Sequence, residues 1–126
     1  LIKYLNDVKY SFNSYTLNSL TIEMGTAAIL DEAYFKETTQ KIIATRERTK
    51  EELRALGYRM DDSKSNFLFV THDTISMEKL FEDKKKDIYV RHFSKPERIA
   101  NYLRITIGTD EEMDTLITFL KNYKQS

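Results

Sequence analysis

Apolar residues in the first 56 positions recur three and four residues apart, which is the spacing of one helix face. This pattern predicts helices over residues 1–10 and 16–30. A longer helix is predicted from Asp31, a favourable N-cap, to Leu56, and Gly57 is the residue type that ends helices in the left-handed conformation. The expected buried positions of this third helix are Phe35, Ile42, Leu53 and Leu56.

The second half of the chain changes to the alternating pattern of β-strands. The predicted strands are a short edge strand at 58–60 and longer strands at 66–70, 88–92 and 102–107. Residues 66–70 are apolar at both alternating positions, so we expect this strand to be covered on both faces. Phe67 and Phe69 are therefore interpreted as core residues.

Two further helices are predicted among and after these strands. One covers residues 76–85, and the other begins at Thr109, whose spacing to Glu112 has the form of a capping box. Their expected inward residues are Met77, Leu80, Phe81, Met113, Leu116, Ile117 and Leu120. The order of elements predicts an α+β fold: N-terminal helices including one long helix, then a small three- to four-stranded mixed or antiparallel sheet with helices packed mainly on one face.

Two arginines lie inside the last two predicted strands. Because side chains alternate along a strand, Leu103, Ile105 and Ile107 share one face and Arg104 lies on the other. In the preceding strand, Val90 and Arg91 lie on opposite faces for the same reason. If the aliphatic faces form the core, both guanidiniums emerge on the same uncovered side of the sheet. Such a pair suits a carboxylate or a phosphate, but from alternation alone ordinary pairing with local acids is the favoured interpretation.

Composition narrows the possible functions. Twenty basic and twenty acidic residues cancel, which argues against a dedicated nucleic-acid or anionic-membrane binder. No stretch is long and apolar enough for a membrane span.

We interpret the charged run 46–54 of the long helix as a solvated face. His72 and His92 are not spaced like metal ligands, and the three glycines form no phosphate-binding loop.

The chain contains no cysteine, so it has no disulfide framework, thiolate metal site or cysteine nucleophile. This composition is consistent with a reducing compartment, and we expect a cytoplasmic protein. The first residue is leucine, which suggests a fragment or a processed chain. By itself, the chain lacks the recognisable parts of an enzyme.

Several segments resemble, in order, the C-terminal part of histidinol-phosphate aminotransferases, which are class I/II, fold-type I enzymes that depend on pyridoxal phosphate. The segments that carry the resemblance are Val8-Lys9, Leu56-Gly57-Tyr58, Asn66-Phe67, the Ile-x-Val-Arg strand 88–91, and the Leu-Arg-Ile-Thr-Ile-Gly-Thr-x-Glu-Glu run within 102–112. The resemblance covers nearly all 126 residues. It implies that residues 1–13 end an interdomain linker and that residues 14–126 form the small domain.

The resemblance also implies substrate-binding roles. In the family, the arginine at the position of Arg104 binds the carboxylate of the amino-acid or oxo-acid substrate. The arginine at the position of Arg91 helps to hold the phosphate of histidinol phosphate. Asn13 matches a linker asparagine at the border of the site, although Ser11 and Phe12 replace the family's Pro-Tyr.

The cofactor-binding parts of the family lie upstream of the matching region. The resemblance implies pyridoxal phosphate in the full-length enzyme, with the Schiff-base lysine in a large domain that this chain lacks. We therefore expect the chain alone to bind no pyridoxal phosphate and to be inactive. The implied partners are the large domain, an amino-acid phosphate, an oxo acid and a second subunit of a homodimer.

Two alternatives remain open at this point. The chain could belong to another class I/II aminotransferase that acts on aromatic or phosphorylated amino acids, because the arginine at the position of Arg104 is widely shared. It could instead be a free-standing α+β module that binds small anions without catalysis.

Overall fold

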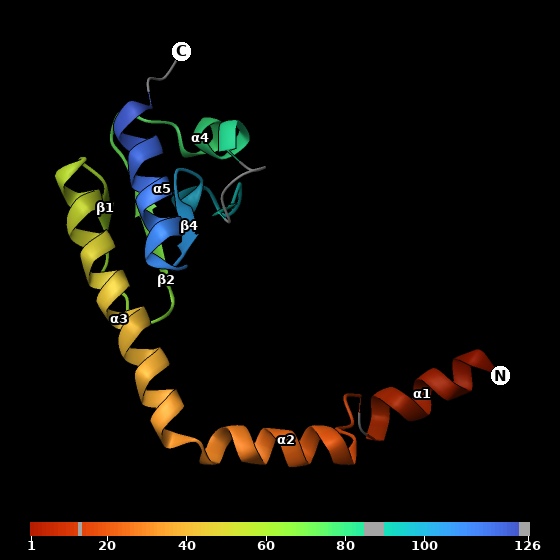
Figure 1. Ribbon diagram of the computed structural model, residues 1–126. Helices are drawn as coiled ribbons and strands as arrows, with labels where there is room; N and C mark the ends of the chain where they lie inside the picture. Colours follow the sequence, from red (N-terminus) through yellow and green to blue (C-terminus); the bar gives the residue numbers. More distant parts are fainter. Residues whose placement is uncertain (13, 85–89, 124–126) are drawn as a thin grey trace. The chain divides into compact units, whose positions relative to one another are not determined.

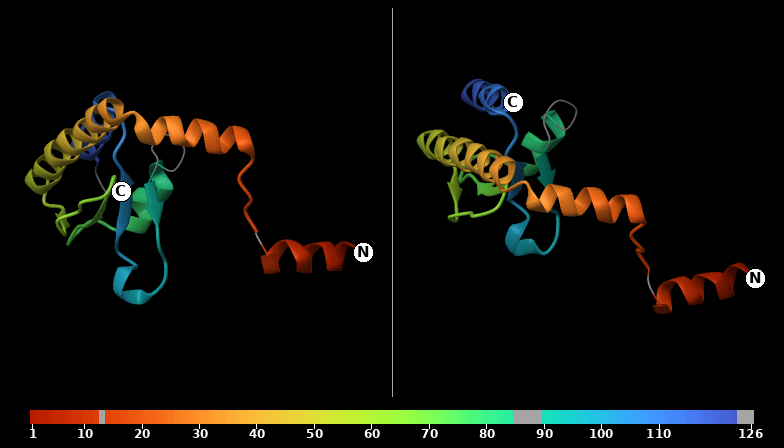
Figure 2. Two further views of the ribbon diagram at one scale, coloured as in Figure 1. Left: turned by 90° about the horizontal axis from the view of Figure 1, so that it is seen from below. Right: turned by 60° about the horizontal axis from the view of Figure 1, so that its bottom comes forward.

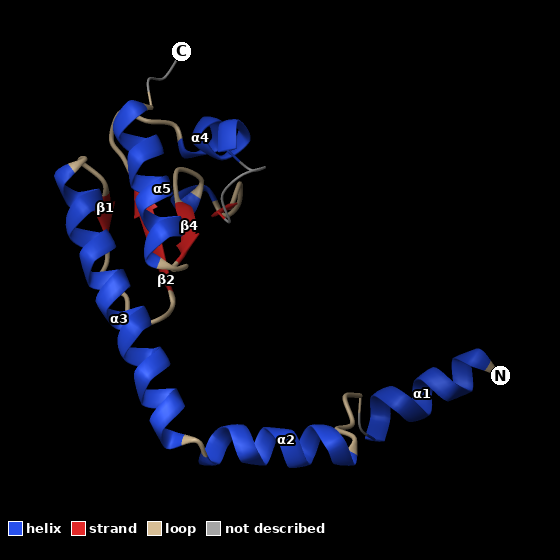
Figure 3. Cartoon of the chain, in the orientation of Figure 1, coloured by secondary structure: helices blue, strands red, loops and turns tan. Residues whose placement is uncertain are grey.

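The computed structural model describes residues 1–12, 14–84 and 90–123, and its helices and strands are shown in Figures 1 and 3. The chain divides into two compact units, residues 1–37 and residues 38–126. Asn13, one of the expected substrate-binding residues, lies outside the described residues. In the part of the chain that the structure describes, no helix is both long and apolar enough to cross a membrane.

The first unit contains α1 (Ile2–Phe12), α2 (Ser19–Leu30) and the first turns of α3 (Glu32–Ala55). α2 begins three residues later than predicted because the side chain of Asn18 caps it, accepting a hydrogen bond of 2.8 Å from the backbone N–H of Thr21. Asp31 caps α3 as expected, accepting from the N–H of Tyr34 at 3.0 Å. No residue of α2 is buried, although the helix is apolar around most of its circumference.

α3 ends through the predicted glycine. Gly57 has φ +89°, and the N–H groups of Tyr58 and Gly57 donate to the carbonyls of Leu53 and Arg54, each at 3.0 Å. These two bonds form a Schellman motif, which satisfies carbonyls at the end of the helix. A Cβ at Gly57 would also stand 3.0 Å from Nε2 of His72, so both conformation and space favour glycine here.

The second unit is built on a four-stranded sheet in which all neighbouring strands are antiparallel. Its strands are β1 (Arg59–Met60), β2 (Phe67–Thr71), β3 (Val90–His92) and β4 (Leu103–Thr106), in the spatial order β1-β2-β4-β3. The short 3₁₀ helix η1 (Glu97–Ile99) lies between β3 and β4 in the sequence. This confirms the α+β prediction and resolves the choice between a mixed and an antiparallel sheet.

One face of the sheet carries the core of the second unit. α4 (Met77–Lys84), α5 (Asp110–Asn122) and the second half of α3 pack their apolar side chains against this face (Figures 1 and 2). The core residues are Leu53, Tyr58, Leu68, Val70, Met77, Leu80, Leu103, Ile105, Ile107, Met113, Leu116, Ile117 and Leu120. The inward residues predicted for the last two helices and for 103–107 are confirmed, with Phe81 partly buried.

The expectation that strand 66–70 is covered on both faces is wrong among the described residues. Leu68 and Val70 are fully buried, whereas Phe67 is 37% exposed and Phe69 is half-buried. All three helices of the second unit contribute to the single core on the side of Leu68 and Val70. Aromatic side chains on the other side are therefore not evidence of a second core.

The interpretation of the charged run in α3 as a solvated face holds for Glu47, Glu51 and Arg54, which are exposed, but is wrong for two of its cations. Arg46 is 5% exposed and Lys50 is 2% exposed. Arg46 donates to the carbonyl of Ser65 at 3.1 Å, and Lys50 donates to Glu47 at 2.8 Å and to Asp62. The segment between β1 and β2 covers this side of the helix, and its oxygen atoms compensate the buried cations. The two apolar positions nearer the start of α3, Phe35 and Ile42, are instead exposed.

Candidate functional site

Arg91 and Arg104 lie directly opposite each other in the register of β3 and β4. On the other side of β4, Phe69 of β2 is the partner of Arg104. Residues that face each other across antiparallel strands project to the same side of the sheet. Phe69, Arg104 and Arg91 therefore form one row across three strands, on the face opposite the helices.

The side chains of the two arginines have no ion pair or hydrogen bond with any other residue that the structure describes. Nε of Arg104 is buried and lacks a hydrogen-bond partner. Arg48 of α3 provides a contrast, because its guanidinium contacts Asp114 at 2.5 Å and Asp110 at 3.0 Å. Among residues 1–12, 14–84 and 90–123, the structure therefore gives no support to the favoured interpretation from alternation, pairing of Arg91 and Arg104 with local acids.

Aromatic rings, rather than carboxylates, surround the guanidiniums. The guanidinium carbon of Arg104 lies 5.2 Å from the ring centroid of Phe67, and that of Arg91 lies 5.0 Å from the ring of Phe93. Phe69 stacks on Tyr102 at 4.7 Å and meets Phe93 edge-on at 5.9 Å. These distances lie within the usual range for cation–π and aromatic pairs.

The sequence analysis missed Phe67 and Phe69 as residues of this face. Their alternation with Leu68 and Val70 was a usable signal, because an antiparallel partner strand carrying Leu103 and Ile105 inward would place the two phenylalanines beside Arg104. The signal was not recognised because all five residues from Asn66 to Val70 were treated as compatible with a covered strand. Tyr102 stacks on Phe69, the cross-strand partner of Arg104.

The arrangement favours an anionic ligand. Two like charges directly opposite each other on neighbouring strands destabilise the sheet, and an anion bound between them relieves the repulsion. A planar guanidinium with unused N–H groups binds a carboxylate or phosphate oxygen pair through two parallel hydrogen bonds. The exposed position of Arg91 and the half-buried position of Arg104 leave the row open on the side away from the core.

Lys50 is unsuited to hold an aldehyde cofactor through a Schiff base. Lys50 is the buried lysine of α3, and its ammonium is hydrogen-bonded to Asp62 and Glu47. These bonds raise the pKa of Lys50, with Asp62 making the larger contribution. An ammonium held protonated between two carboxylates is unsuited to nucleophilic attack on an aldehyde, which requires the neutral amine.

The family model for aminotransferases of class I and II matches residues 1–120 of the chain. The chain belongs to this family.

Curated relatives agree with this assignment. The aminotransferase chain is 52% identical over 122 residues to a histidinol-phosphate aminotransferase of Brachyspira hyodysenteriae, with 96% of the chain covered. It is 50% identical over 123 residues to a protein of the same name from Lactococcus lactis subsp. cremoris, with 97% covered. In both cases the match covers 34% of the relative, so the chain spans about a third of the length of these proteins.

Solved structures support the fold. The aminotransferase chain superimposes on a putative histidinol-phosphate aminotransferase from Erwinia carotovora atroseptica with a TM-score of 0.73 and 18% identity, covering 84% of this chain and 30% of that one. A putative aminotransferase from Burkholderia pseudomallei matches with a TM-score of 0.53 and 30% identity, covering 67% of this chain and 26% of that one. The α+β architecture is thus that of an aminotransferase domain.

Proposed function

We propose that the chain is the C-terminal, substrate-binding domain of a histidinol-phosphate aminotransferase. The reaction transfers the amino group of histidinol phosphate to 2-oxoglutarate, which yields imidazole acetol phosphate and glutamate in histidine biosynthesis. Identities of about half of all positions to relatives of that name support the choice of substrate. The observation that carries the proposal is the pair Arg91 and Arg104, partners in strand register whose side chains have no carboxylate partner among the described residues.

In this proposal, Arg104 binds the carboxylate of glutamate or 2-oxoglutarate, and Arg91 helps to hold the phosphate of histidinol phosphate. A guanidinium fork orients an oxygen pair in one plane, which reduces the orientational freedom of the bound substrate. The half-buried environment of Arg104 strengthens its electrostatic attraction for a substrate anion relative to a fully solvated arginine. Asn13 is retained as a residue at the border of the site.

The cofactor in this proposal is pyridoxal phosphate, which acts as an electron sink when bound in the complete enzyme. Its lysine and the groups that hold its ring and phosphate would come from the large domain. The contribution of the present chain is to bind and orient the substrate anions and to exclude water from that side of the site. The chain alone is proposed to be inactive.

The missing large domain is the proposed partner of the first unit. α2 is apolar around most of its circumference, yet none of its residues is buried, with Leu20 64% and Met24 65% exposed. A helix of this composition is normally enclosed on all sides. The proposed assembly is a homodimer of the full-length enzyme in the cytoplasm.

A chimera tests the proposed function. The matching third of the Brachyspira hyodysenteriae relative is replaced by this chain, and glutamate formation from histidinol phosphate and 2-oxoglutarate is measured. Phenylalanine and tyrosine serve as competing amino donors. Preference for histidinol phosphate supports the proposal, whereas preference for an aromatic amino acid assigns the domain to another class I/II aminotransferase. A chimera that binds cofactor but uses none of these donors contradicts it.

The chain alone provides the matching negative test. It is mixed with pyridoxal phosphate, dialysed and examined by absorbance. A visible band that survives dialysis would contradict the assignment of the cofactor lysine to the large domain.

A further inference from the structure

We propose that Phe67 and Phe93 are positioning residues that hold the guanidiniums of Arg104 and Arg91 by stacking, so that the N–H edges of both arginines stay available to an anion. This inference deepens the proposed function and relies on it only for the identity of the anion. The stacking itself is tested independently of any enzymatic activity.

Phe67 reaches Arg104 diagonally across two strands. The register of β2 and β4 pairs Phe69 with Arg104 and Phe67 with Thr106, so Phe67 lies one pair away on the same face. Long and aromatic side chains reach each other at this diagonal distance. The guanidinium carbon of Arg104 lies 5.2 Å from the Phe67 ring centroid, within cation–π range.

Stacking and ion pairing use different parts of the guanidinium. A carboxylate binds the N–H edge in the guanidinium plane, as Asp110 and Asp114 do with Arg48. A ring that packs against the flat face leaves the edge donors unused, and the ring centroid of Phe67 lies 5.2 Å from the guanidinium carbon of Arg104. The contacts of Arg104 agree with this distinction, because its Nε has no hydrogen-bond partner among the described residues although the side chain lies beside Phe67.

Arg91 is supported in a similar manner. Its guanidinium carbon lies 5.0 Å from the ring centroid of Phe93, just beyond the end of β3. Phe93 is braced edge-on by Phe69 at 5.9 Å, and Phe69 stacks on Tyr102 at 4.7 Å. Phe93 therefore belongs to an aromatic cluster with Phe69 and Tyr102 on the face that carries Arg91.

Loss of a ring should weaken anion binding without removing charge. A leucine at position 67 retains apolar volume but has no π face, so the Arg104 side chain gains freedom that an anion must then restrict. Cation–π interactions at partly exposed sites predict a rise of about three- to tenfold in the dissociation constant. A tryptophan, which offers a larger π face, should keep the dissociation constant within about twofold of that of the unmodified chain.

The first experiment uses the chain itself and inorganic phosphate as the probe. Side-chain Nε–H signals of the arginines are followed by NMR during a phosphate titration of the unmodified chain, Phe67→Leu and Phe67→Trp. Phe35→Leu is the matched control, because Phe35 is 63% exposed and belongs to the other unit. Thermal unfolding of each variant verifies that it is folded.

The expected result has two parts. Phe67→Leu removes the ring-current shift of the Arg104 signal and weakens phosphate binding, whereas Phe67→Trp and Phe35→Leu bind phosphate as the unmodified chain does. Folded Phe67→Leu with unchanged Arg104 signals and unchanged affinity overturns the proposal. Equal weakening by Phe67→Leu and Phe67→Trp also overturns it, because that result indicates a packing role.

The second experiment uses the chimera and separates the two proposals. Phe67→Leu should raise the KM of the anionic substrates about three- to tenfold and leave kcat within about twofold, since the reacting groups belong to the large domain. A fall in kcat at constant KM contradicts positioning by Phe67. If the chimera has no activity with histidinol phosphate but the chain still shows ring-dependent phosphate binding, the proposed function fails and the positioning role stands.

Discussion

Lys50 is 2% exposed, and its ammonium is hydrogen-bonded to the carboxylate of Asp62 in the segment between β1 and β2. The same ammonium donates to Glu47 at 2.8 Å, and Asp62 also contacts Lys64 at 3.1 Å. This contact ties the middle of α3 to the segment that leads into β2. It thereby helps to hold the strand that carries Phe67 and Phe69.

The Lys50 contact predicts a specific loss of stability in acid. Hydrogen bonds from Lys50 and then Lys64 lower the pKa of Asp62 to about 2, from an ordinary value of 3.8. A carboxyl whose pKa is lower in the folded state than in the unfolded state stabilises the fold at pH values above its unfolded-state pKa. This stabilisation disappears as the pH falls from the unfolded-state pKa towards 2. Asp62→Asn should unfold at lower urea concentration at neutral pH and show a weaker dependence on pH in this window.

Asp73→Asn is the control for this measurement, because Asp73 pairs with Arg59 in a contact whose side chains are 68% and 67% exposed. Exposed pairs contribute little to stability. An Asp62→Asn midpoint that differs from the unmodified chain no more than that of Asp73→Asn would contradict the role of the buried contact.

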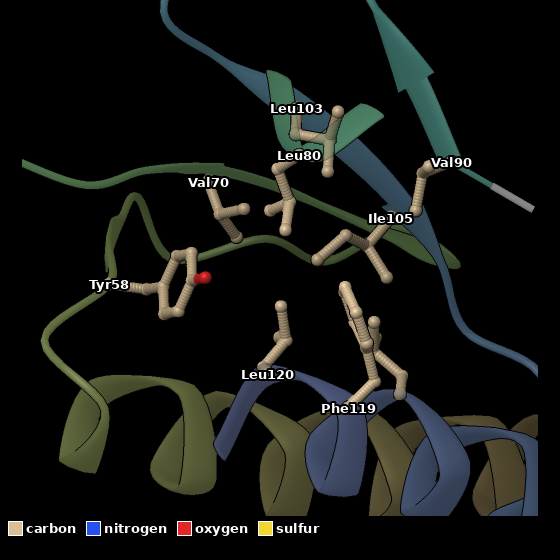
Figure 4. Close-up of a pocket in the computed structure, with 9 residues that line it drawn as sticks. Tyr58, Val70, Leu80, Val90, Leu103, Ile105, Phe119 and Leu120 are labelled. Atoms are coloured by element: carbon tan, nitrogen blue, oxygen red, sulfur yellow. The ribbon is translucent and has the colours of Figure 1, made fainter. Parts of the chain in front are cut away.

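Tyr58 places an unpartnered hydroxyl inside the core. Its side chain is 3% exposed, and its oxygen has no hydrogen-bond partner among the described residues. The hydroxyl points into a small cavity of about 10 Å³ among Val70, Ile105 and Leu120 (Figure 4). Because a buried unsatisfied hydroxyl is unfavourable, Tyr58→Phe should raise the free energy of unfolding by about 1 kcal/mol. Tyr15→Phe, at an 88% exposed position, should change it little.

Alkaline unfolding provides a second test of Tyr58. Burial raises the pKa of its hydroxyl to about 12, from an ordinary value of 10.0. The folded state therefore favours the neutral hydroxyl over its anion. The free energy of unfolding does not depend on this group below the unfolded-state pKa, and it falls as the pH rises from there through 12. Stability of the unmodified chain should decline more steeply over this range than that of Tyr58→Phe. Parallel curves for the two proteins would count against a buried titrating hydroxyl.

Gly108 leaves room for the capping box of α5. A Cβ at this position would stand 2.1 Å from Oε2 of Glu112, which accepts the N–H of Thr109 at 2.8 Å. Gly108→Ala should displace the Glu112 carboxylate and lower the free energy of unfolding by about 1 kcal/mol, the usual value of a helix cap.

A double-mutant cycle isolates this effect. Once Glu112→Ala has removed the carboxylate, Gly108→Ala should cost much less than it does in the unmodified chain. Urea unfolding of the four proteins gives the coupling. Additive losses would indicate that the close approach of Gly108 and Glu112 is irrelevant to stability.

Catalysis by the chimera should depend on both the charge and the planar shape of the Arg104 side chain. In the chimera, Arg104→Ala should cost about 2–5 kcal/mol of transition-state stabilisation, the typical penalty for truncating one member of a buried charged contact. Arg104→Lys should recover only part of the loss, because an ammonium cannot form the planar fork. Steady-state kinetics with both substrates measure the effect. Arg54→Ala, which removes a partly exposed arginine of α3 paired with Glu51, is the control. Unchanged kinetics for Arg104→Ala would remove Arg104 from the proposed site.

Local signals in the sequence predicted the ends of the helices well. The Asp31 cap, the left-handed Gly57 and the Thr109–Glu112 capping box all appear where they were expected. Each depends on residues within about one helical turn of each other, so the information is contained in a short stretch of chain. The start of α2 was placed three residues too early, because the hydrophobic pattern did not reveal that the side chain of Asn18 provides the cap.

Burial was less predictable than secondary structure. Arg46 and Lys50 are buried although they belong to a charged run, and Phe67 is partly exposed although its strand is apolar throughout. Periodicity assigns residues to a face but does not identify the segment that covers that face. For α3 the covering segment lies between β1 and β2, and its oxygen atoms are what make burial of the two cations possible.

The sequence by itself determined that Arg91 and Arg104 project from the sheet on the side away from the aliphatic core, because side chains alternate strictly along a strand. Only the tertiary structure decided that the two arginines are partners in the register of β3 and β4, with their guanidinium carbons 5.0 Å from the ring of Phe93 and 5.2 Å from the ring of Phe67. Strand register is set by packing between segments far apart in the chain. The same packing keeps the acids of α3 and α5 with Arg48, on the other side of the sheet from this pair.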